Sequence, residues 1–226
     1  MTGFHSYART ALAIALLALG ACSSATSAGR SAPPDEKRDD AWYVAKARAD
    51  SARLPYTAAD IHFMSAMIGH HAQAIEMSKL APTNGAGAAV QRLAERIINA
   101  QADEITTMQT WLKDRLQPVP EAKGGPMKMM MNGMEHMMLM PGMLSDEQMK
   151  KLAAARGQEF DRLFLSLMIQ HHRGAVGMVK ELFESPGGGQ DDTIFKLASD
   201  VNVDQVTEIA RMEQLLAAIG ATKPAP

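Results

Sequence analysis

Histidine and methionine side chains recur together in this chain, at a spacing that could bind a soft metal ion. Two His-His pairs are each set among methionines, and the second group repeats the first with a constant offset of 101 residues. The repeated residues are Met67, His70, His71 and Met77, then Met168, His171, His172 and Met178. Imidazole nitrogen binds many transition metals, and thioether sulfur selects Cu(I) over hard cations. The repeat therefore predicts a metal site that occurs twice.

The segment between the two copies carries the strongest indication of copper. Residues 127–143 hold nine of the eighteen methionines in the chain, together with His136. The candidate ligands there are Met127, Met130, Met131, Met134, His136, Met137, Met140 and Met143. Because glycine and proline argue against a long helix, we expect a flexible loop whose Met-x-x-Met spacing gathers several sulfurs on one Cu(I) ion. The alternative is a hydrophobic linker or docking surface.

A further pair of matching stretches follows the histidine groups, at residues 101–108 and 205–212. Each stretch carries a glutamine, a glutamate and a methionine at the same spacing: Gln101, Glu104 and Met108, then Gln205, Glu208 and Met212. On a helical wheel the glutamine and the glutamate fall on the apolar face. A buried carboxylate is costly without a partner, so two interpretations stay open. Either Glu104 and Glu208 hydrogen-bond the histidines, or this polar centre binds a cation.

The two histidines of each pair are expected to have different surroundings. At about 100° per residue, His71 and His172 lie in the middle of the core face of their helices. His70 and His171 lie on the flank, beside the later methionine of each group. We therefore expect the flanking histidines and the repeated methionines to be more exposed, and to bind metal. A lone methionine on an apolar face is usually core filler, but recurrence beside a histidine favours ligation.

Helical periodicity and turn residues predict two helical hairpins, over residues 57–116 and 145–219, joined by the methionine-rich loop 117–143. Capping boxes are expected where the hairpins begin, at Thr57-Ala-Ala-Asp60 and at Ser145-Asp-Glu-Gln148.

The second of these helices is expected to continue to about Glu184, with a kink near Gly157. No stretch shows sustained strand alternation bounded by turns. Two hairpins that each have one apolar face bury those faces together, which predicts an all-α four-helix bundle over residues 57–219.

The N-terminus has the pattern of an export signal. Residues 1–21 combine a positive charge with a short apolar run, which is too short to span a bilayer as a mature helix. Leu19-Gly-Ala-Cys22 resembles the lipobox of bacterial lipoproteins, so Cys22 is the expected lipidation site; the alternative is an ordinary signal peptide cleaved nearby. Residues 22–56 are expected to form a flexible tether, in which residues 42–53 could form a short helix. The protein is thus expected outside the cytoplasm, anchored by lipid and facing the periplasm or the cell exterior.

Charge and composition exclude several functions. The net charge of −2 becomes −3 without residues 1–21, and there is no basic stripe, so nucleic-acid binding is not expected. Membrane contact is expected only through the lipid. An enzyme is not expected either, because Glu104 and Glu208 are the only repeated inward acids and neither is followed by a histidine three residues later. The alternatives kept are a ferritin-like metalloenzyme and a structural or partner-binding bundle.

Both copies fit the pattern Phe-x-x-x-Met-Ile-x-His-His-x-x-Ala-[Ile/Val]-x-Met, and one difference between them is Leu165, where the first copy has Met64. This pattern resembles the DUF305 family, exported bacterial proteins that include CopM-like copper-binding proteins. The resemblance covers about residues 57–219 and implies a ferritin-like four-helix bundle. His62, whose counterpart is Leu163, is a further difference between the halves.

By this resemblance the protein is expected to bind copper outside the cytoplasm, to sequester or deliver it, and to contribute to copper tolerance. Cu(I) is favoured at the methionine-rich loop, and Cu(II) could bind the histidines. A protein that delivers copper to it, or accepts copper from it, is the expected partner.

Overall fold

The computed structural model describes residues 45, 55–131 and 134–221. The expected signal peptide, the lipidation site Cys22, nearly all of the tether and the short helix expected at residues 42–53 lie outside the described residues. The leader and the lipid anchor therefore stay predictions.

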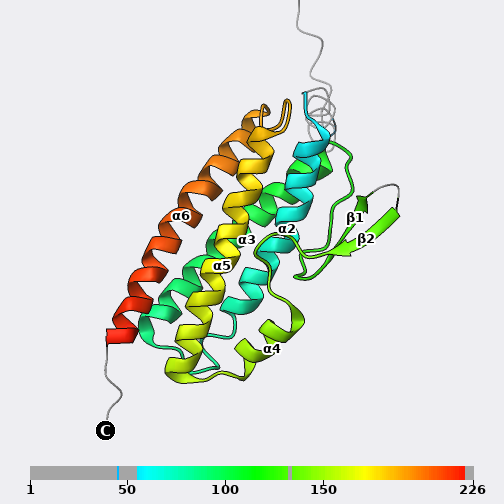
Figure 1. Cartoon of the computed structure of the whole chain (residues 1–226). Coiled ribbons are helices and arrows are strands. Elements are labelled where there is room, and N and C mark those ends of the chain that lie inside the picture. Colours follow the sequence, from blue (N-terminus) through cyan, green and yellow to red (C-terminus); the bar gives the residue numbers. More distant parts are fainter. Residues whose placement is uncertain (1–44, 46–54, 132–133, 222–226) are drawn as a thin grey trace, which may run out of the picture. The chain divides into compact units, whose positions relative to one another are not determined.

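Four long helices pack as two antiparallel hairpins (Figure 1). In the first hairpin α2 (Ala58–Ser78) lies along α3 (Ala88–Asp114), and in the second α5 (Gly157–Glu184) lies along α6 (Asp192–Ala221). The hairpins meet mainly through α2 and α5, whereas α3 and α6 touch at few positions. The predicted all-α bundle of two duplicated hairpins is confirmed. Within the described residues, none of the helices has the length and apolar character needed to cross a membrane.

The two predicted capping boxes are present. At the start of α2, Thr57 Oγ1 accepts a hydrogen bond from Asp60 N, and Thr57 N donates to Asp60 Oδ2 at 2.7 Å. At the start of α4 (Asp146–Ala154), Ser145 and Gln148 exchange the same pair of bonds. These bonds satisfy backbone donors that the first helical turn leaves without partners, and so fix where each helix begins.

The helix expected from residue 145 to residue 184 is broken, which corrects the expectation of a single kinked helix. It forms α4 and α5, separated by residues 155–156. Asn84, in the turn after α2, donates through Nδ2 to the carbonyls of Leu152, Ala153 and Ala155. These contacts take up the carbonyls at the end of α4, and Gly157 then begins α5 with a φ of +56°.

A small antiparallel sheet lies in the methionine-rich segment, where no strand was expected. Strand β1 (Met127–Met131) pairs with β2 (Met134–Met138). The register pairs Met127 with Met138, Lys128 with Met137, Met129 with His136, Met130 with Glu135 and Met131 with Met134. This β-hairpin replaces the flexible loop, and it projects from the side of the bundle next to α2 (Figure 1).

The two halves are tied together by reciprocal contacts at opposite ends of the α2–α5 pair. Asp60, at the start of α2, accepts a hydrogen bond from Gly189 N at 2.7 Å, in the turn before α6. Asp161, at the start of α5, accepts from Gly87 N at 3.1 Å, in the turn before α3. Because α2 and α5 run antiparallel (Figure 1), the exchange indicates an approximate two-fold axis between them.

Candidate metal centre

His70 and His171 meet where α2 packs against α5. Their ring centroids are 3.8 Å apart and their planes are inclined by 42°. The adjacent rings of His71 and His172 each lie 6.3 Å from their neighbour in the pair. All four side chains are fully buried. The expectation that His70 and His171 occupy an exposed flank is therefore wrong: they are the two histidines in contact at the centre.

Three of the four rings face an oxygen atom through Nε2. His70 Nε2 donates to the carbonyl oxygen of Pro141 at 3.0 Å. His172 Nε2 is hydrogen-bonded to Glu208 Oε2 at 2.8 Å. His71 Nε2 lies at the same distance from Glu104 Oε2, but its angle departs from hydrogen-bond geometry. Each glutamate thus faces a histidine of its own hairpin, as in the first of the two interpretations that the sequence left open.

These oxygen contacts determine which ring nitrogen is free. A carbonyl only accepts hydrogen bonds, as does an ionised carboxylate, so the proton of the facing imidazole sits on Nε2 and Nδ1 keeps its lone pair. The Nδ1 atoms of all four histidines, and the Nε2 atoms of His71 and His171, are buried without a hydrogen-bond partner in the protein. Metal-binding histidines typically donate their other nitrogen to a carbonyl or carboxylate in this way. The arrangement fits imidazoles that are oriented to bind metal through Nδ1.

Electrostatics keep the central histidines neutral. Burial, and then the neighbouring His71, lower the pKa of His70 to about 3; the Pro141 carbonyl opposes this shift and His172 adds to it. Burial and then the charge of His70 hold the pKa of His171 well below its ordinary value. A neutral ring has a lone pair available for a metal ion without first losing a proton.

The methionines on the helices are buried, against the expectation that those beside the flanking histidines are more exposed. Met67, Met77, Met108, Met168 and Met212 are fully buried, and Met178 is 6% exposed. They fill the two apolar clusters of the core together with leucine, isoleucine and phenylalanine. Met67 and Met168 each lie three residues before a central histidine, which places them on the same helix face as that ring. Met67 and Met168 therefore pack in the core and also lie on the side of the helix that carries His70 or His171.

Residues 140–144 form a strap that closes over the central histidines. Met140 and Met143 are buried in the core, and Pro141 supplies the carbonyl that holds His70. The side-chain amide of Gln73, on α2, makes two hydrogen bonds with the backbone of Leu144: Nε2 donates to the carbonyl oxygen, and Oε1 accepts from the N–H. Met140 and Met143 therefore belong to the bundle core and do not extend a mobile run of Met-x-x-Met ligands.

A glycine on α5 allows the strap to lie so close. A Cβ atom on Gly174 would be 1.9 Å from the Pro141 carbonyl oxygen and 2.7 Å from Gly142 Cα. Gly142 itself has a φ of +79°, a region that glycine enters without strain.

The β-hairpin presents its methionines to solvent. Met134 and Met137 are each 61% exposed, Met138 is 40% exposed, and His136 is also exposed. Side chains alternate between the two faces of a strand, so Met134, His136 and Met138 share one face. The other face carries Met137 and an ion pair between Lys128 and Glu135 at 3.1 Å. Strand alternation, and not Met-x-x-Met spacing, thus decides which thioethers can share an ion. At the base of the hairpin, Met127 packs on the core beside α2.

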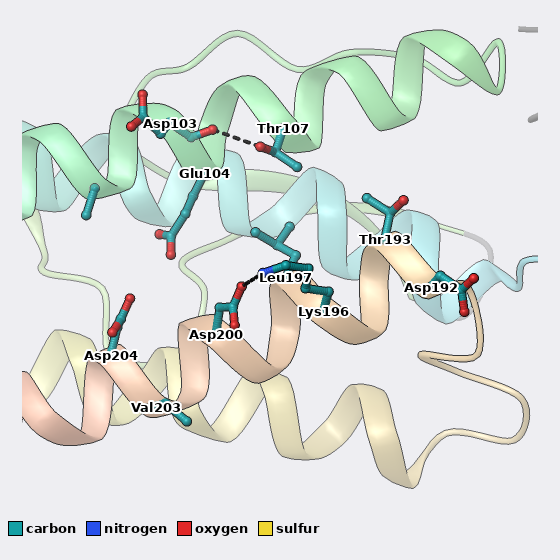
Figure 2. Close-up of a pocket in the computed structure, with 11 residues that line it drawn as sticks. Asp103, Glu104, Thr107, Asp192, Thr193, Lys196, Leu197, Asp200, Val203 and Asp204 are labelled. Atoms are coloured by element: carbon teal, nitrogen blue, oxygen red, sulfur yellow. Dashed lines mark hydrogen bonds and ion pairs between the residues drawn. The ribbon is translucent and has the colours of Figure 1, made fainter. Parts of the chain in front are cut away.

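Several carboxylates line a groove between α3 and α6. Figure 2 shows Glu104 of α3 and Asp204 of α6 facing each other across this groove. Gln101 and Gln205 lie buried behind them, in the inner pocket that Glu208 also lines. Asp204 did not emerge from the sequence, although Asp200, Asp204 and Glu208 follow each other at intervals of four residues and so share a helix face.

Preformed ligand clusters are absent from the described part of the chain. Among the residues described, no three His, Cys, Asp or Glu side chains are gathered so as to hold one metal ion. A metal ion at the centre would therefore need two imidazoles joined by thioethers, or a small rearrangement of the rings.

Comparison with known families matches residues 60–216 to the DUF305 model, described as a domain of unknown function. A comparison with curated proteins gives no match. Among solved structures, a candidate secreted DUF305 protein from Streptomyces coelicolor is 34% identical, with a TM-score of 0.61 over 74% of this chain and 98% of that one. A DUF305 fragment from Deinococcus radiodurans is 28% identical, with a TM-score of 0.60 over 73% of this chain and 99% of that one.

CopM in its Cu(I)-bound form is also similar. It is 29% identical to this chain, and the match has a TM-score of 0.55 and covers 73% of this chain and 98% of CopM. CopM has also been solved in Cu(II)-bound, silver-bound and apo forms.

Proposed function

The chain belongs to the DUF305 family, and on that premise we propose that it is an exported protein that binds copper through histidine and methionine and sequesters or delivers it. One observation carries this proposal. His70 and His171 lie fully buried with their rings 3.8 Å apart, and their Nδ1 atoms have no partner in the protein. Unpartnered buried polar atoms cost about 1–3 kcal/mol each, and a bound metal ion would offset that cost.

Copper is the metal that the ligand types favour. The centre offers neutral imidazoles, with the buried thioethers of Met67 and Met168 on the same helix faces, and sulfur ligands favour Cu(I) over hard cations. CopM, which shares the fold, has been solved with Cu(I), Cu(II) and silver bound. Cu(I) fits the thioethers, and Cu(II) fits the imidazoles with Glu104 and Glu208 as the groups that orient them.

The β-hairpin is proposed as a second, exposed place of copper binding. Its open face combines Met134, His136 and Met138 on one short strand, close to solvent. An exposed site can exchange an ion with another protein, whereas the buried centre can retain one. This division supports both the sequestering role and the copper-delivering or copper-accepting protein partner.

Export and anchoring are part of the proposal. The apolar leader and the Leu-Gly-Ala-Cys22 sequence support a lipoprotein held at the membrane by lipid alone, and a similar DUF305 structure is of a candidate secreted protein. In that location copper binding would contribute to copper tolerance. A strain lacking the gene is expected to stop growing at a lower copper concentration, and complementation with the Cys22→Ala variant would show whether the anchor matters.

We propose binding and not catalysis. The inward acids Glu104 and Glu208 are each paired with a histidine of the partner helix, and not with the Glu-x-x-His motifs of di-iron bundles. Turnover of peroxide or oxidation of added iron by the purified protein would contradict this.

The direct test is a titration of the mature chain with Cu(I) against a competing chelator. Replacing Met134, Met137 and Met138 by leucine removes three exposed sulfurs while keeping their bulk, and should lower the number of bound ions by at least one. His171→Leu should weaken the remaining site at least tenfold. Met149→Leu, in a partly buried core position, is the matched control and should change neither value. Binding no tighter than millimolar in the wild type would contradict copper binding altogether.

A further inference from the structure

Between α3 and α6 lies a pocket that none of the histidines and methionines of the proposed copper centre line. It has a volume of about 180 Å³. Its lining includes two glutamines and three acids, Gln101, Glu104, Asp204, Gln205 and Glu208. The pocket exists because α3 and α6 touch at few positions, unlike the helices within each hairpin.

The glutamines are the first sign that this pocket takes a ligand. Gln101 is only 2% exposed, and neither Oε1 nor Nε2 of its side chain has a hydrogen-bond partner in the protein. Gln205, the equivalent residue of the second half, is 3% exposed and its Oε1 is also without a partner. A buried amide that lacks partners is costly. Here the cost occurs twice, at matching positions that line the same pocket.

The acidic side chains that line the pocket indicate that its ligand is a cation. Glu104, Asp204 and Glu208 bring three carboxylates to the pocket, and the cation that lines it is Arg96, which pairs with Glu208 at 3.1 Å and is about half exposed. Burial and then the charges of Glu104 and Glu208 raise the pKa of Asp204, and Arg96 opposes this shift. The carboxylates thus repel one another, and a positive ion between them would relieve that repulsion.

The larger groove outside leads into the pocket. This groove, of about 700 Å³, shares Ala100, Glu104 and Asp204 with the inner pocket. Three further acids line it, Asp103, Asp192 and Asp200 (Figure 2). Lys196 forms an ion pair with Asp200 there. A cleft lined mostly by one sign of charge raises the local concentration of counter-ions.

We propose that the pocket between α3 and α6 binds a hydrated divalent cation through the carboxylates of Glu104, Asp204 and Glu208 and the amide oxygens of Gln101 and Gln205. Oxygen ligands of this kind suit Mg²⁺ and Mn²⁺ rather than Cu(I). The acids are not gathered around one point, so the ion keeps part of its water shell, as Mg²⁺ usually does. The site goes beyond copper binding, and two of its acids, Glu104 and Glu208, connect it to His71 and His172.

Mn²⁺ is the probe for this site, because the free ion can be counted by electron paramagnetic resonance during a titration of the full mature chain. Asp204→Asn should weaken Mn²⁺ binding at least tenfold. The double variant Gln101→Leu with Gln205→Leu should weaken it several-fold and raise the melting temperature of the metal-free protein. None of these residues orients a histidine, so Cu(I) binding should stay unchanged in all three positions.

The matched control is Asp103→Asn, which removes the same charge from the outer groove only and should change Mn²⁺ affinity less than threefold. The Met134, Met137 and Met138 leucine variant should bind Mn²⁺ like the wild type. Absence of saturable Mn²⁺ binding, or equal effects of Asp204→Asn and Asp103→Asn, would overturn the proposal. Either result would leave the copper titration, and thus the proposed function, untouched.

Discussion

Complete burial without a full set of hydrogen-bond partners distinguishes His70 and His171 from ordinary core histidines. A core histidine that serves packing usually satisfies both ring nitrogens, whereas His171 satisfies neither. The two rings also lie against each other, so protonating one raises the cost of protonating the other. The same pair therefore destabilises the metal-free protein and is the most suitable place for a metal ion.

The stability of the metal-free protein should fall as the pH drops below about 6.5. In the folded state the pKa of His70 is lowered to about 3 and that of His171 lies well below its ordinary value, so both stay neutral while the unfolded chain becomes protonated. Stability is therefore full above pH 6.5 and is lost towards pH 3, by up to about 1.4 kcal/mol per pH unit for each histidine. Urea unfolding after treatment with a chelator, at pH 7, 6 and 5, measures this slope.

His171→Leu should make that slope shallower and leave stability at pH 7 unchanged or higher, because it removes a ring whose nitrogens have no partner. His136→Leu, on the exposed strand β2, should leave the slope unaltered. Asp161 and Asp204 have the opposite effect on stability, because the pKa of each is raised, chiefly by burial. Their protonation stabilises the folded state as the pH falls through the raised pKa values. A slope of zero between pH 7 and pH 5 in the wild type would contradict the buried neutral pair.

At the scale of elements, the strap of residues 140–144 depends on one glycine. Gly174→Ala puts a Cβ atom 1.9 Å from the Pro141 carbonyl oxygen, so the strap must move and His70 loses its hydrogen-bond partner. We expect a loss of about 3 kcal/mol in the free energy of unfolding, measured by urea unfolding, and weaker Cu(I) binding.

Gly177→Ala is the matched control on the same helix. A Cβ atom there meets nothing within 4 Å, and alanine is the better helix former, so stability should rise by up to about 1 kcal/mol. Similar losses in the two variants would show that the strap is not held by this close approach.

Local signals in the sequence were sufficient for the helices and insufficient for the segment between them. The capping boxes and turn residues are short-range features, so α2 begins, and α3 and α6 end, close to the predicted bounds of the hairpins. The break before α5 depends on Asn84, which lies 68 to 71 residues from the carbonyls it binds. The β-hairpin was missed because methionines occupy both faces of its strands, which hides the alternation that marks a strand.

The candidate site was predicted in part for the same reason. The repeat and the antiparallel geometry of each hairpin brought Glu104 and Glu208 to the level of the histidines, but left open whether these acids bond the histidines or bind a cation. Predicting the contact of His70 with His171 would have required knowing how α2 crosses α5 and that the strap covers them. A helical wheel assumes that a helix has one buried side. Helix α2 packs against α3, α5 and the strap, so more than one of its sides is buried.

At the scale of the whole molecule, the reciprocal bonds of Asp60 and Asp161 hold the two hairpins in register. Asp60→Ala and Asp161→Ala should each lower the free energy of unfolding by about 1–3 kcal/mol, because each leaves a glycine N–H without its charged acceptor. The two contacts lie at opposite ends of the bundle, so the losses should add within about 0.5 kcal/mol in the double variant.

Urea unfolding of both single variants and the double variant checks this, with Asp103→Ala, on an exposed position of α3, as a control expected to stay within about 0.5 kcal/mol. A double variant no less stable than either single variant would show that one end alone holds the hairpins together.

Two identical chains form reciprocal bonds of this kind across an isologous interface, where each chain makes the same contacts with the other. A half-length ancestor with one hairpin would have presented the same self-complementary surface and assembled as a homodimer. Fusing two gene copies into one polypeptide added the connection between α3 and α4, which had no counterpart in such a dimer. That connection has no counterpart in the repeat, and half of the methionines are found there. Covalent linkage thus made room for an asymmetric, methionine-rich element on a symmetric scaffold.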